Sequence, residues 1–267
     1  TAAVTNGNDA PTGSVSISGT ATQGQTLTAS DTLTDADGLG ILTYTWKADG
    51  TTVGTGTTYL LTEAEVGKVI TVTASYTDGH GTAEAVTSAA TTAVTNANDA
   101  PTGNVTITGT ATQGQTLTAS DTLTDADGLG TLTYTWKADG TTVGTGTSYL
   151  LTEAEVGKVI TVVASYTDGH GTAEAVTSAA TTAVTNTNDA PTGNVTITGT
   201  ATQGETLTAS DTLADTDGLG TLTYTWKADG TTVGTGTTYL LSEAEVGKVT
   251  TVVASYTDGH GTAEAVT

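Results

Sequence analysis

The sequence predicts an all-β protein made of three tandem β-sandwich domains. Its strongest signal is repetition: residues 8–95 align without a gap on residues 98–185 and differ only at positions 14, 16, 18, 41, 58 and 73. A third copy runs from residue 188 to Thr267. Apolar and polar residues alternate within each copy, as in half-buried strands, and the 90-residue spacing suits independent domains better than solenoid repeats. We therefore predict domains at residues 1–97, 98–187 and 188–267.

The first copy shows the order of the elements. Val15 and Ile17 share one face of the first expected strand, and Tyr44 and Trp46 share one face of the third. The segments GTATQG, DADGLG, ADG and DGHG supply turn residues between strands. TEAEVG, at 62–67, favours a single helical turn. We expect strands A to G at 14–19, 25–30, 41–47, 51–54, 58–61, 68–77 and 82–95.

Seven short strands with a tryptophan on the third are typical of an immunoglobulin-like Greek-key sandwich. Strand C of that fold buries its tryptophan, so we expect Trp46, Trp136 and Trp226 in the cores rather than stacked on sugars. Because the strands alternate in direction, the two termini of each domain lie at opposite ends. The three domains are therefore expected to form a linear array.

Composition excludes several functional classes. The formal net charge is -22, from 28 acidic residues against 6 lysines and no arginine. Nucleic-acid binding needs a basic face, and anionic membranes attract basic segments, so neither partner fits. No cysteine is present, which excludes disulfides and thiolate metal sites. No nucleophile has a partner pattern, and we expect a protein that is not an enzyme.

The linkers between copies carry a recurring motif. NANDAP occupies 96–101, NTNDAP 186–191 and NGNDAP 6–11. In the expected fold, the B–C and F–G loops lie beside the incoming linker and the E–F turn lies beside the outgoing one. Acidic and amide side chains of successive domains should therefore meet at each linker. Unbalanced carboxylates about 4 Å apart would repel one another by several kcal/mol at intermediate dielectric.

Oxygen-only, acidic and flexible ligand sets are what Ca²⁺ requires, whereas Zn²⁺ and copper prefer histidine or cysteine. The predicted ligands at the first junction are Glu63, Glu65, Asn96, Asn98, Asp99, Asp125, Asp127 and Asp168. Those at the second are Glu153, Glu155, Asn186, Asn188, Asp189, Asp215, Asp217 and Asp258. A half-site without an E–F partner consists of Asn6, Asn8, Asp9, Asp35, Asp37 and Asp78.

A plainer interpretation of these residues stays open. Asp, Asn and Gly also favour turns for purely local reasons, so the loops could be solvated turns without a metal. His80, His170 and His260 lie in the expected F–G turns, where we interpret them as solvated residues with no ligand role.

Each junction combines four motifs: N-x-N-D-A-P in the linker, D-x-D-G in the B–C loop, D-x-G in the F–G loop and E-A-E after strand E. In this combination each junction resembles the interdomain calcium arrangement of cadherins. The whole unit resembles the immunoglobulin-like, cadherin-like tandem repeats of giant bacterial adhesins exported by type I secretion. That resemblance implies an extracellular extender on the bacterial cell surface, stiffened by Ca²⁺ as its cofactor. Its partners would be neighbouring repeats of the same chain, with no direct membrane contact.

The alternative function is an adhesive module, in which the repeats themselves bind a glycan, a surface or one another. It predicts an exposed aromatic or apolar patch. The N-terminal TAAVTN matches TTAVTN at 91–96 and 181–186, so the chain starts inside a repeat and is interpreted as a fragment of a longer array. We expect this fragment to be monomeric.

Overall fold

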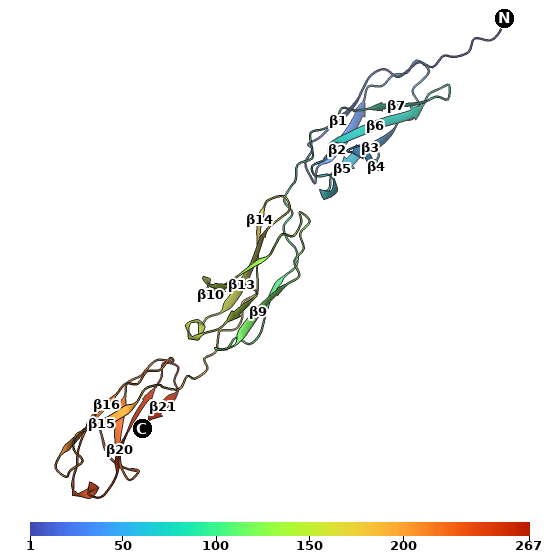
Figure 1. Ribbon diagram of the computed structural model, residues 1–267. Coiled ribbons are helices and arrows are strands. Elements are labelled where there is room, and N and C mark those ends of the chain that lie inside the picture. Colours follow the sequence, from blue (N-terminus) through green and yellow to red (C-terminus); the bar gives the residue numbers. More distant parts are fainter. The chain divides into compact units, whose positions relative to one another are not determined.

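The computed structural model describes residues 1–267 and is built from β-strands and three short 3₁₀ turns. Each of the three repeats contributes one three-stranded and one four-stranded sheet, and all strand pairs of these sheets are antiparallel (Figure 1). The predicted all-β, immunoglobulin-like sandwich class is confirmed. None of the helical turns has the length and apolar character needed to cross a membrane.

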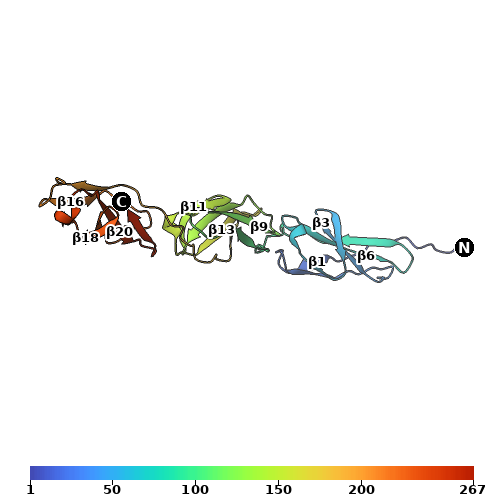
Figure 2. The same cartoon turned by 90° about the horizontal axis from the view of Figure 1, so that it is seen from below.

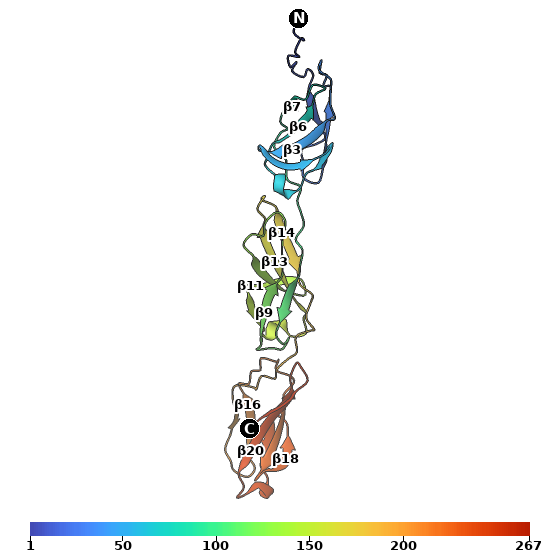
Figure 3. The same cartoon turned by 90° about the vertical axis from the view of Figure 1, so that its right-hand side faces the viewer.

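In repeat 1 the smaller sheet has the order β1-β2-β5 and the larger one β4-β3-β6-β7. Strands β3, β6 and β7 lie side by side in Figure 3, and Figure 2 shows β1 against the sheet that contains β3 and β6. The elements are β1 (Val15–Ser18), β2 (Thr26–Asp31), β3 (Thr43–Ala48), β4 (Thr51–Thr55), β5 (Thr58–Leu60), η1 (Glu63–Glu65), β6 (Ile70–Thr77) and β7 (Ala83–Thr87).

Repeats 2 and 3 have the same element order. Repeat 2 holds β8 (Val105–Thr108), β9 (Thr116–Asp121), β10 (Thr133–Ala138), β11 (Thr141–Thr145), β12 (Ser148–Leu150), η2 (Glu153–Glu155), β13 (Ile160–Thr167) and β14 (Ala173–Thr177). Repeat 3 holds β15 (Val195–Thr198), β16 (Thr206–Asp211), β17 (Thr223–Ala228), β18 (Thr231–Thr235), β19 (Thr238–Leu240), η3 (Glu243–Glu245), β20 (Thr250–Thr257) and β21 (Ala263–Val266).

The strand expected as D, at 51–54, is present in the structure, but the letter D does not describe its pairing. It is β4, which pairs with β3 and therefore takes the position of a C′ strand. The cause is the two-residue turn Asp49-Gly50, whose φ angles of 46° and 81° match the positive values that tight hairpins need. A chain that reverses through two residues must pair with the strand it has just left.

The expected final strand, 82–95, is also divided. Only Ala83–Thr87 form β7, and the chain later makes two isolated parallel bridges, Val94 to Val66 and Thr95 to Thr22. These bridges attach the end of the repeat to the turn after β5 and to the segment before β2. The repeat is therefore closed by residues that directly precede the linker.

The cores are centred on the three tryptophans, as predicted. Trp46, Trp136 and Trp226 are fully buried. The indole N–H of Trp46 donates to the Gly56 carbonyl at 2.8 Å, and its ring stacks on Tyr59 with 5.9 Å between centroids. Burying an aromatic of this size with its one donor satisfied is favourable. The tryptophans are core residues.

The chain groups into two compact units. One comprises Thr1–Gly103, Leu123–Leu132 and Ser165–Ala175, and the other comprises Asn104–Thr122, Thr133–Ala164 and Val176–Thr267. Two loops of repeat 2 thus belong with repeat 1 and the first linker. The division into domains at residues 1–97, 98–187 and 188–267 stays a prediction.

Candidate metal centre

The first linker is anchored on repeat 1 by a glutamine. The side chain of Gln23 accepts from the Ala97 N–H at 3.1 Å and donates to Asp99 Oδ2 at 2.6 Å. Immediately upstream, Val94 is 2% exposed and forms its bridge with Val66. Amide geometry lets one glutamine satisfy a donor and an acceptor two residues apart. The linker backbone is therefore held in one path as it leaves the repeat.

The same linker is hydrogen-bonded to a loop and a strand of repeat 2, the β9–β10 loop and β14. The Asp99 N–H donates to Asp127 Oδ2 at 2.7 Å, and Asn98 Nδ2 donates to Glu174 Oε1 at 2.8 Å. Asp127 precedes a glycine in the loop between β9 and β10, and it is 4% exposed. A carboxylate this deeply buried needs compensation for the hydration it loses.

The two loops of repeat 2 support each other. The Gly169 N–H donates to the Asp127 carbonyl at 2.9 Å, and a Cβ atom at Gly169 would lie 2.5 Å from that oxygen. Asp125 Oδ1 accepts from the Asp127 N–H at 2.9 Å, and its other oxygen accepts from the Tyr166 hydroxyl. Glycine is required here because the two backbones touch.

Asp168 forms the turn after β13. Its Oδ1 accepts from the backbone N–H groups of His170 and Thr172 at 2.9 and 2.8 Å, while its buried Oδ2 has no partner. Burial raises the pKa of Asp168, but those N–H groups outweigh it and hold the pKa below the usual range. The free oxygen therefore carries negative charge at neutral pH.

Repeat 1 contributes the turn η1. Glu63 Oε1 lies 2.8 Å from His170 Nε2, and its Oε2 is buried without a partner. Glu65 differs, because its Oε2 accepts from the Thr62 N–H and hydroxyl at 2.9 and 2.7 Å, which closes a capping box. Glu63 faces repeat 2, and Glu65 stabilises its own turn.

Four buried oxygens at this linker have no hydrogen-bond partner, and they come from three elements of the sandwich and the linker itself. Ligand atoms of Glu63, Asp127 and His170 all lie within 4.8 Å of one another. Buried polar atoms nearly always have a hydrogen-bond partner, so each exception needs a structural explanation. The unpartnered atoms are Glu63 Oε2, Asn96 Oδ1, Asp127 Oδ1 and Asp168 Oδ2.

The second linker repeats this geometry. Gln113 donates to Asp189 at 2.8 Å, the Asp189 N–H donates to Asp217 at 2.7 Å, and His260 Nε2 lies 2.7 Å from Glu153. Ligand atoms of Glu153, Asp217 and His260 again lie within 4.8 Å. The unpartnered buried oxygens are Glu153 Oε2, Asn186 Oδ1, Asp217 Oδ1 and Asp258 Oδ2.

The N-terminal half-site is less complete. Asn8 Nδ2 donates to Glu84 at 2.7 Å, and the Asp9 N–H donates to Asp37 at 2.8 Å, so the loops have the same arrangement. Asn6 is exposed. Of the half-site residues, only Asp78 has a buried oxygen without a partner. The unpartnered set is complete only where a preceding repeat supplies a glutamate.

The predicted ligand residues therefore divide into two groups. Those with an unpartnered oxygen supply the ligand atoms that a cation needs. The others already bond to the protein: Glu65 and Glu155 cap turns, Asp125 and Asp215 accept from tyrosines, Asp99 and Asp189 accept from glutamines, and Asn98 and Asn188 donate to Glu174 and Glu264. Asp35 likewise accepts from the Tyr76 hydroxyl at 2.5 Å. Metal binding by either group stays a prediction.

Two histidines have a role that the sequence interpretation missed. His170 and His260 contact a glutamate of the preceding repeat, so they are not merely solvated turn residues. Hydrogen bonding to Glu63 raises the pKa of His170, and burial opposes that effect. Asp127 and Asp168 raise it further through charge. The repeated DGHG motif was the available signal, but its partner lies more than a whole repeat away.

The donor set fits a hard cation. Carboxylate and amide oxygens from flexible loops are typical calcium ligands, which number six to eight and include water. A transition metal would instead use the imidazole together with two carboxylates. In either case, a cation would supply positive charge to buried oxygens that the protein itself leaves unpaired.

No family model and no curated protein matches the chain. Among solved structures it is similar to a Ca²⁺-stabilised adhesin that helps an Antarctic bacterium reach out and bind ice, with 18% identity over 97% of this chain and 73% of that chain and a TM-score of 0.33. It is also similar to a tetra-tandem repeat from the extending region of a large adhesion protein, with 20% identity over 97% and 74% and a TM-score of 0.34.

A third similar structure is the D1–D4 ectodomain fragment of ICAM-5, with 13% identity over 94% of this chain and 74% of that chain and a TM-score of 0.39. Repeats of bacterial large adhesins are thus among the structural neighbours, as the sequence resemblance predicts. Identity and TM-score are low throughout. What those neighbours bind is a property of those proteins.

Proposed function

We propose that this chain is a structural extender segment of a large bacterial surface adhesin, and that Ca²⁺ bound at its linkers rigidifies it. This proposal rests on one observation: each of the two linkers has a set of buried oxygens without hydrogen-bond partners. These sets include Asp127 Oδ1 and Asp217 Oδ1. Ions held between a glutamate turn, the linker and two loops of the next repeat would remove the freedom of the linker. The extracellular setting follows from the resemblance of the repeats.

The proposed ligands are the groups whose oxygens lack partners. At the first linker these are Glu63, Asn96, Asp127 and Asp168, with water completing the coordination. Bound calcium would neutralise a cluster whose carboxylates otherwise repel one another. Extracellular modules bind Ca²⁺ with dissociation constants of about 10⁻⁴–10⁻³ M, so the joints would form outside a cell and loosen inside it.

No catalytic role is proposed. The alternative, in which the repeats themselves bind glycans by aromatic stacking, is not favoured, because Trp46, Trp136 and Trp226 are fully buried. The most exposed large apolar side chain within a repeat, Ile41, is replaced by Thr131 and Thr221 in the other copies. A recognition surface built on Ile41 would therefore be absent from the second and third repeats.

The test combines calcium titration with small-angle X-ray scattering. We expect calorimetry to detect Ca²⁺ binding to the wild-type chain. Asp127→Asn should remove the binding at the first linker only, and the double variant Asp127→Asn with Asp217→Asn should show no binding. Asp37→Asn is the matched control, because Asp37 occupies the same loop position without a preceding repeat. Excess EDTA should shorten the maximum dimension of the wild-type chain while circular dichroism shows the sheets intact.

Two outcomes would contradict the proposal. Scattering profiles that coincide in Ca²⁺ and EDTA would leave the acidic loops as solvated turns. Binding of Zn²⁺ that His170→Gln removes, in the absence of Ca²⁺ binding, would assign the cluster to a transition metal.

A further inference from the structure

A glutamine before β2 bonds to alternate residues of the chain that leaves repeat 1. The backbone N–H of Gln23 donates to the Thr95 carbonyl at 3.0 Å, and its side-chain carbonyl accepts from the Ala97 N–H at 3.1 Å. Its side-chain Nε2 donates to Asp99 Oδ2 at 2.6 Å. Alternate residues of an extended segment present their groups to the same side, so one glutamine holds the whole stretch from Thr95 to Asp99.

The glutamine is itself fixed by the segment that leads into η1. The Gly24 N–H donates to the Leu61 carbonyl, and the Leu61 N–H donates to the Gln25 carbonyl, both at 2.9 Å. Leu61 is 1% exposed, so these bonds lie against the core, and Gln23 is half-buried. A side chain whose backbone is already anchored loses less freedom when it bonds to the linker.

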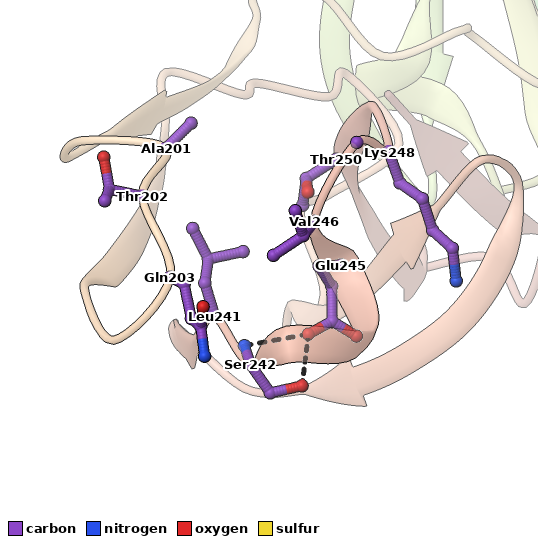
Figure 4. Close-up of a pocket in the computed structure, with 10 residues that line it drawn as sticks. Ala201, Thr202, Gln203, Leu241, Ser242, Glu245, Val246, Lys248 and Thr250 are labelled. Atoms are coloured by element: carbon purple, nitrogen blue, oxygen red, sulfur yellow. Dashed lines mark hydrogen bonds between the residues drawn. The ribbon is translucent and has the colours of Figure 1, made fainter.

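Figure 4 shows how this position lies against the glutamate turn, as seen in repeat 3. Gln203 lies next to Leu241, and the Gly204 N–H donates to the Leu241 carbonyl at 2.8 Å. The N–H and hydroxyl of Ser242 donate to Glu245 Oε2 at 2.9 and 2.7 Å. The glutamine and the turn with its capping box are therefore parts of one hydrogen-bonded unit.

Asp99 connects the glutamine of repeat 1 to a proposed calcium ligand. Its Oδ2 accepts from Gln23, and its backbone N–H donates to Asp127 Oδ2 at 2.7 Å. Asp127 is 4% exposed, and its other oxygen, Oδ1, has no partner. A carboxylate is planar, so a donor fixed on one oxygen limits the positions of the other. The Asp99 N–H therefore leaves Oδ1 as the atom available to a cation.

The second linker has the same chain of hydrogen bonds. The backbone N–H of Gln113 donates to the Thr185 carbonyl at 2.9 Å, and its side chain accepts from the Thr187 N–H at 3.0 Å and donates to Asp189 at 2.8 Å. The Asp189 N–H donates to Asp217 Oδ2 at 2.7 Å, and Asp217 Oδ1 has no partner. The middle linker residue differs between the linkers, but the glutamine side chain bonds only to its N–H.

A neutral amide suits this environment. Glu63, Asp127 and Asp168 are carboxylates with unpartnered oxygens, so their surroundings carry negative potential. Glutamine donates to the linker aspartate without adding charge. A lysine would donate as well, but its positive charge would compete with a cation. A glutamate could not donate to a carboxylate and would repel it.

We propose that Gln23 and Gln113 are positioning residues for the two calcium sites, an inference that rests on the proposed function. Each glutamine keeps the linker aspartate as a structural acceptor, and the N–H of that aspartate orients the loop aspartate whose Oδ1 binds the ion. Asp99 and Asp189 are therefore not ligands. Loss of a group that orients a metal ligand typically weakens metal binding by about 10- to 100-fold.

The first test is calorimetric titration of the 267-residue chain with Ca²⁺. Gln23→Glu should weaken binding at the first linker by about 10- to 100-fold and leave the second linker unchanged, and Gln113→Glu should give the reverse. The sign is informative, because an added carboxylate that acted only through its charge would strengthen binding. Gln25→Ala is the matched control, since Gln25 is exposed and the third repeat carries Glu205 in its place. It should leave binding unchanged.

The second test exchanges the two partners. In Gln23→Glu with Asp99→Asn, the carboxylate at position 23 accepts from the Ala97 N–H and from the amide at position 99, and the net charge equals that of the wild type. This double variant should recover most of the affinity that Gln23→Glu loses. Asp99→Asn alone should bind nearly as well as the wild type, because its amide oxygen still accepts from Gln23. If Asp99 is a ligand, both variants should instead bind more weakly than their parents, which would overturn the proposal.

A metal-free measurement shows whether the glutamine holds the linker. In EDTA, hydrogen exchange at the Ala97 amide should be faster in Gln23→Ala than in the wild type or Gln25→Ala. The Val72 amide, which donates to Ser88 Oγ at 3.1 Å in the core, should stay protected in all three chains. That protection shows that repeat 1 remains folded, so a change at Ala97 is local.

These measurements separate this inference from the proposed function. If the wild type binds no Ca²⁺ while exchange at Ala97 depends on Gln23, the glutamine holds the linker, and the calcium function fails together with the role of Gln23 in it. If Ca²⁺ binds at both linkers but Gln23→Glu binds like the wild type, the calcium function stands and the positioning role alone is wrong. Unchanged exchange at Ala97 in Gln23→Ala would also contradict that role.

Discussion

His170 Nε2 lies 2.8 Å from Glu63 Oε1, although 107 positions separate the two residues in the sequence. His260 and Glu153 repeat the contact at 2.7 Å with the same separation. The corresponding His80 makes no such contact; its Nε2 lies 3.9 Å from Asp37, and its side chain is 56% exposed against 31% for His170. The imidazole is thus partnered only where one repeat follows another.

This contact predicts a pH dependence of the metal-free protein. Hydrogen bonding to Glu63 raises the pKa of His170 in the folded state. The contact therefore stabilises the fold fully below the unfolded pKa of about 6.5 and loses its effect as pH rises through the higher folded pKa. We expect thermal unfolding in EDTA to shift to lower temperature as pH increases across that window.

Glu63→Gln tests this assignment by proton-detected titration of the histidine rings. The pKa of His170 should fall, while that of His260 should not change, because its own partner Glu153 is intact. Glu153→Gln should give the reverse pattern. Equal behaviour of both histidines in the two variants would contradict the contact.

The two glutamates of each turn are expected to have separate roles. Glu155→Ala removes the acceptor for the Thr152 N–H and hydroxyl, so it should cost about 1 kcal/mol of unfolding free energy, as loss of a helix cap does. Glu153→Ala should change stability in EDTA less and reduce Ca²⁺ binding more. Chemical denaturation and calorimetry on the two variants measure both effects. A larger loss of binding in Glu155→Ala would reverse the assignment.

Most of the fold could be predicted from the sequence because its signals are local. Alternation marks the strands, and the buried Trp46 fits the third strand of an immunoglobulin-like sandwich. Strand β4 shows where such signals stop: alternation predicts the strand but not its partner, and its pairing with β3 depends on the two-residue turn Asp49-Gly50. The turn was visible in the sequence as ADG but was treated only as a break.

The location of the candidate site could be predicted from the sequence, but the separate roles of its residues could not. Topology alone brings the E–F turn, the linker and the two loops together. It does not show that Thr62 and Tyr59 engage Glu65, or that Glu63 remains free to face His170. Those outcomes depend on side-chain geometry within a turn of three residues. The histidine contact in particular joins residues of different repeats, which no single-repeat pattern reveals.

The close approach of two loops predicts a sensitive glycine. A Cβ atom at Gly169 would lie 2.5 Å from the Asp127 carbonyl, so Gly169→Ala must move the loop that carries this carboxylate. We expect reduced Ca²⁺ binding at the first linker. Gly79→Ala makes the same clash with Asp37 in repeat 1, where no glutamate turn precedes, and should leave binding at both linkers intact. Calorimetric titration of the two variants decides the matter.

The tryptophans allow a test of the three-domain division. Trp136 is fully buried, donates to the Gly146 carbonyl at 2.8 Å and stacks on Tyr149, so Trp136→Ala should cost about 3–5 kcal/mol. If residues 98–187 fold independently, scanning calorimetry in EDTA should show one component shifted and the remaining components unmoved. Because 3–5 kcal/mol is a large share of a small domain's stability, Ile160→Val, at about 0.5–1.5 kcal/mol, supplies a milder variant.

Leu150→Ala is the control for that experiment, since Leu150 is 55% exposed and its loss should change stability by no more than about 0.5 kcal/mol. A shift of the whole unfolding transition in Trp136→Ala would mean that the repeats unfold together even without calcium. That result would favour cooperative units with a boundary inside repeat 2 over three independent domains. Adding Ca²⁺ should then distinguish the cases further, because bound cations stabilise the folded state by about 2.7 kcal/mol at a hundredfold excess over the dissociation constant. If the domains are independent, the unfolding of neighbouring repeats should be coupled only when Ca²⁺ is bound. The unfolding temperature of the shifted component should then move back toward those of the neighbouring repeats.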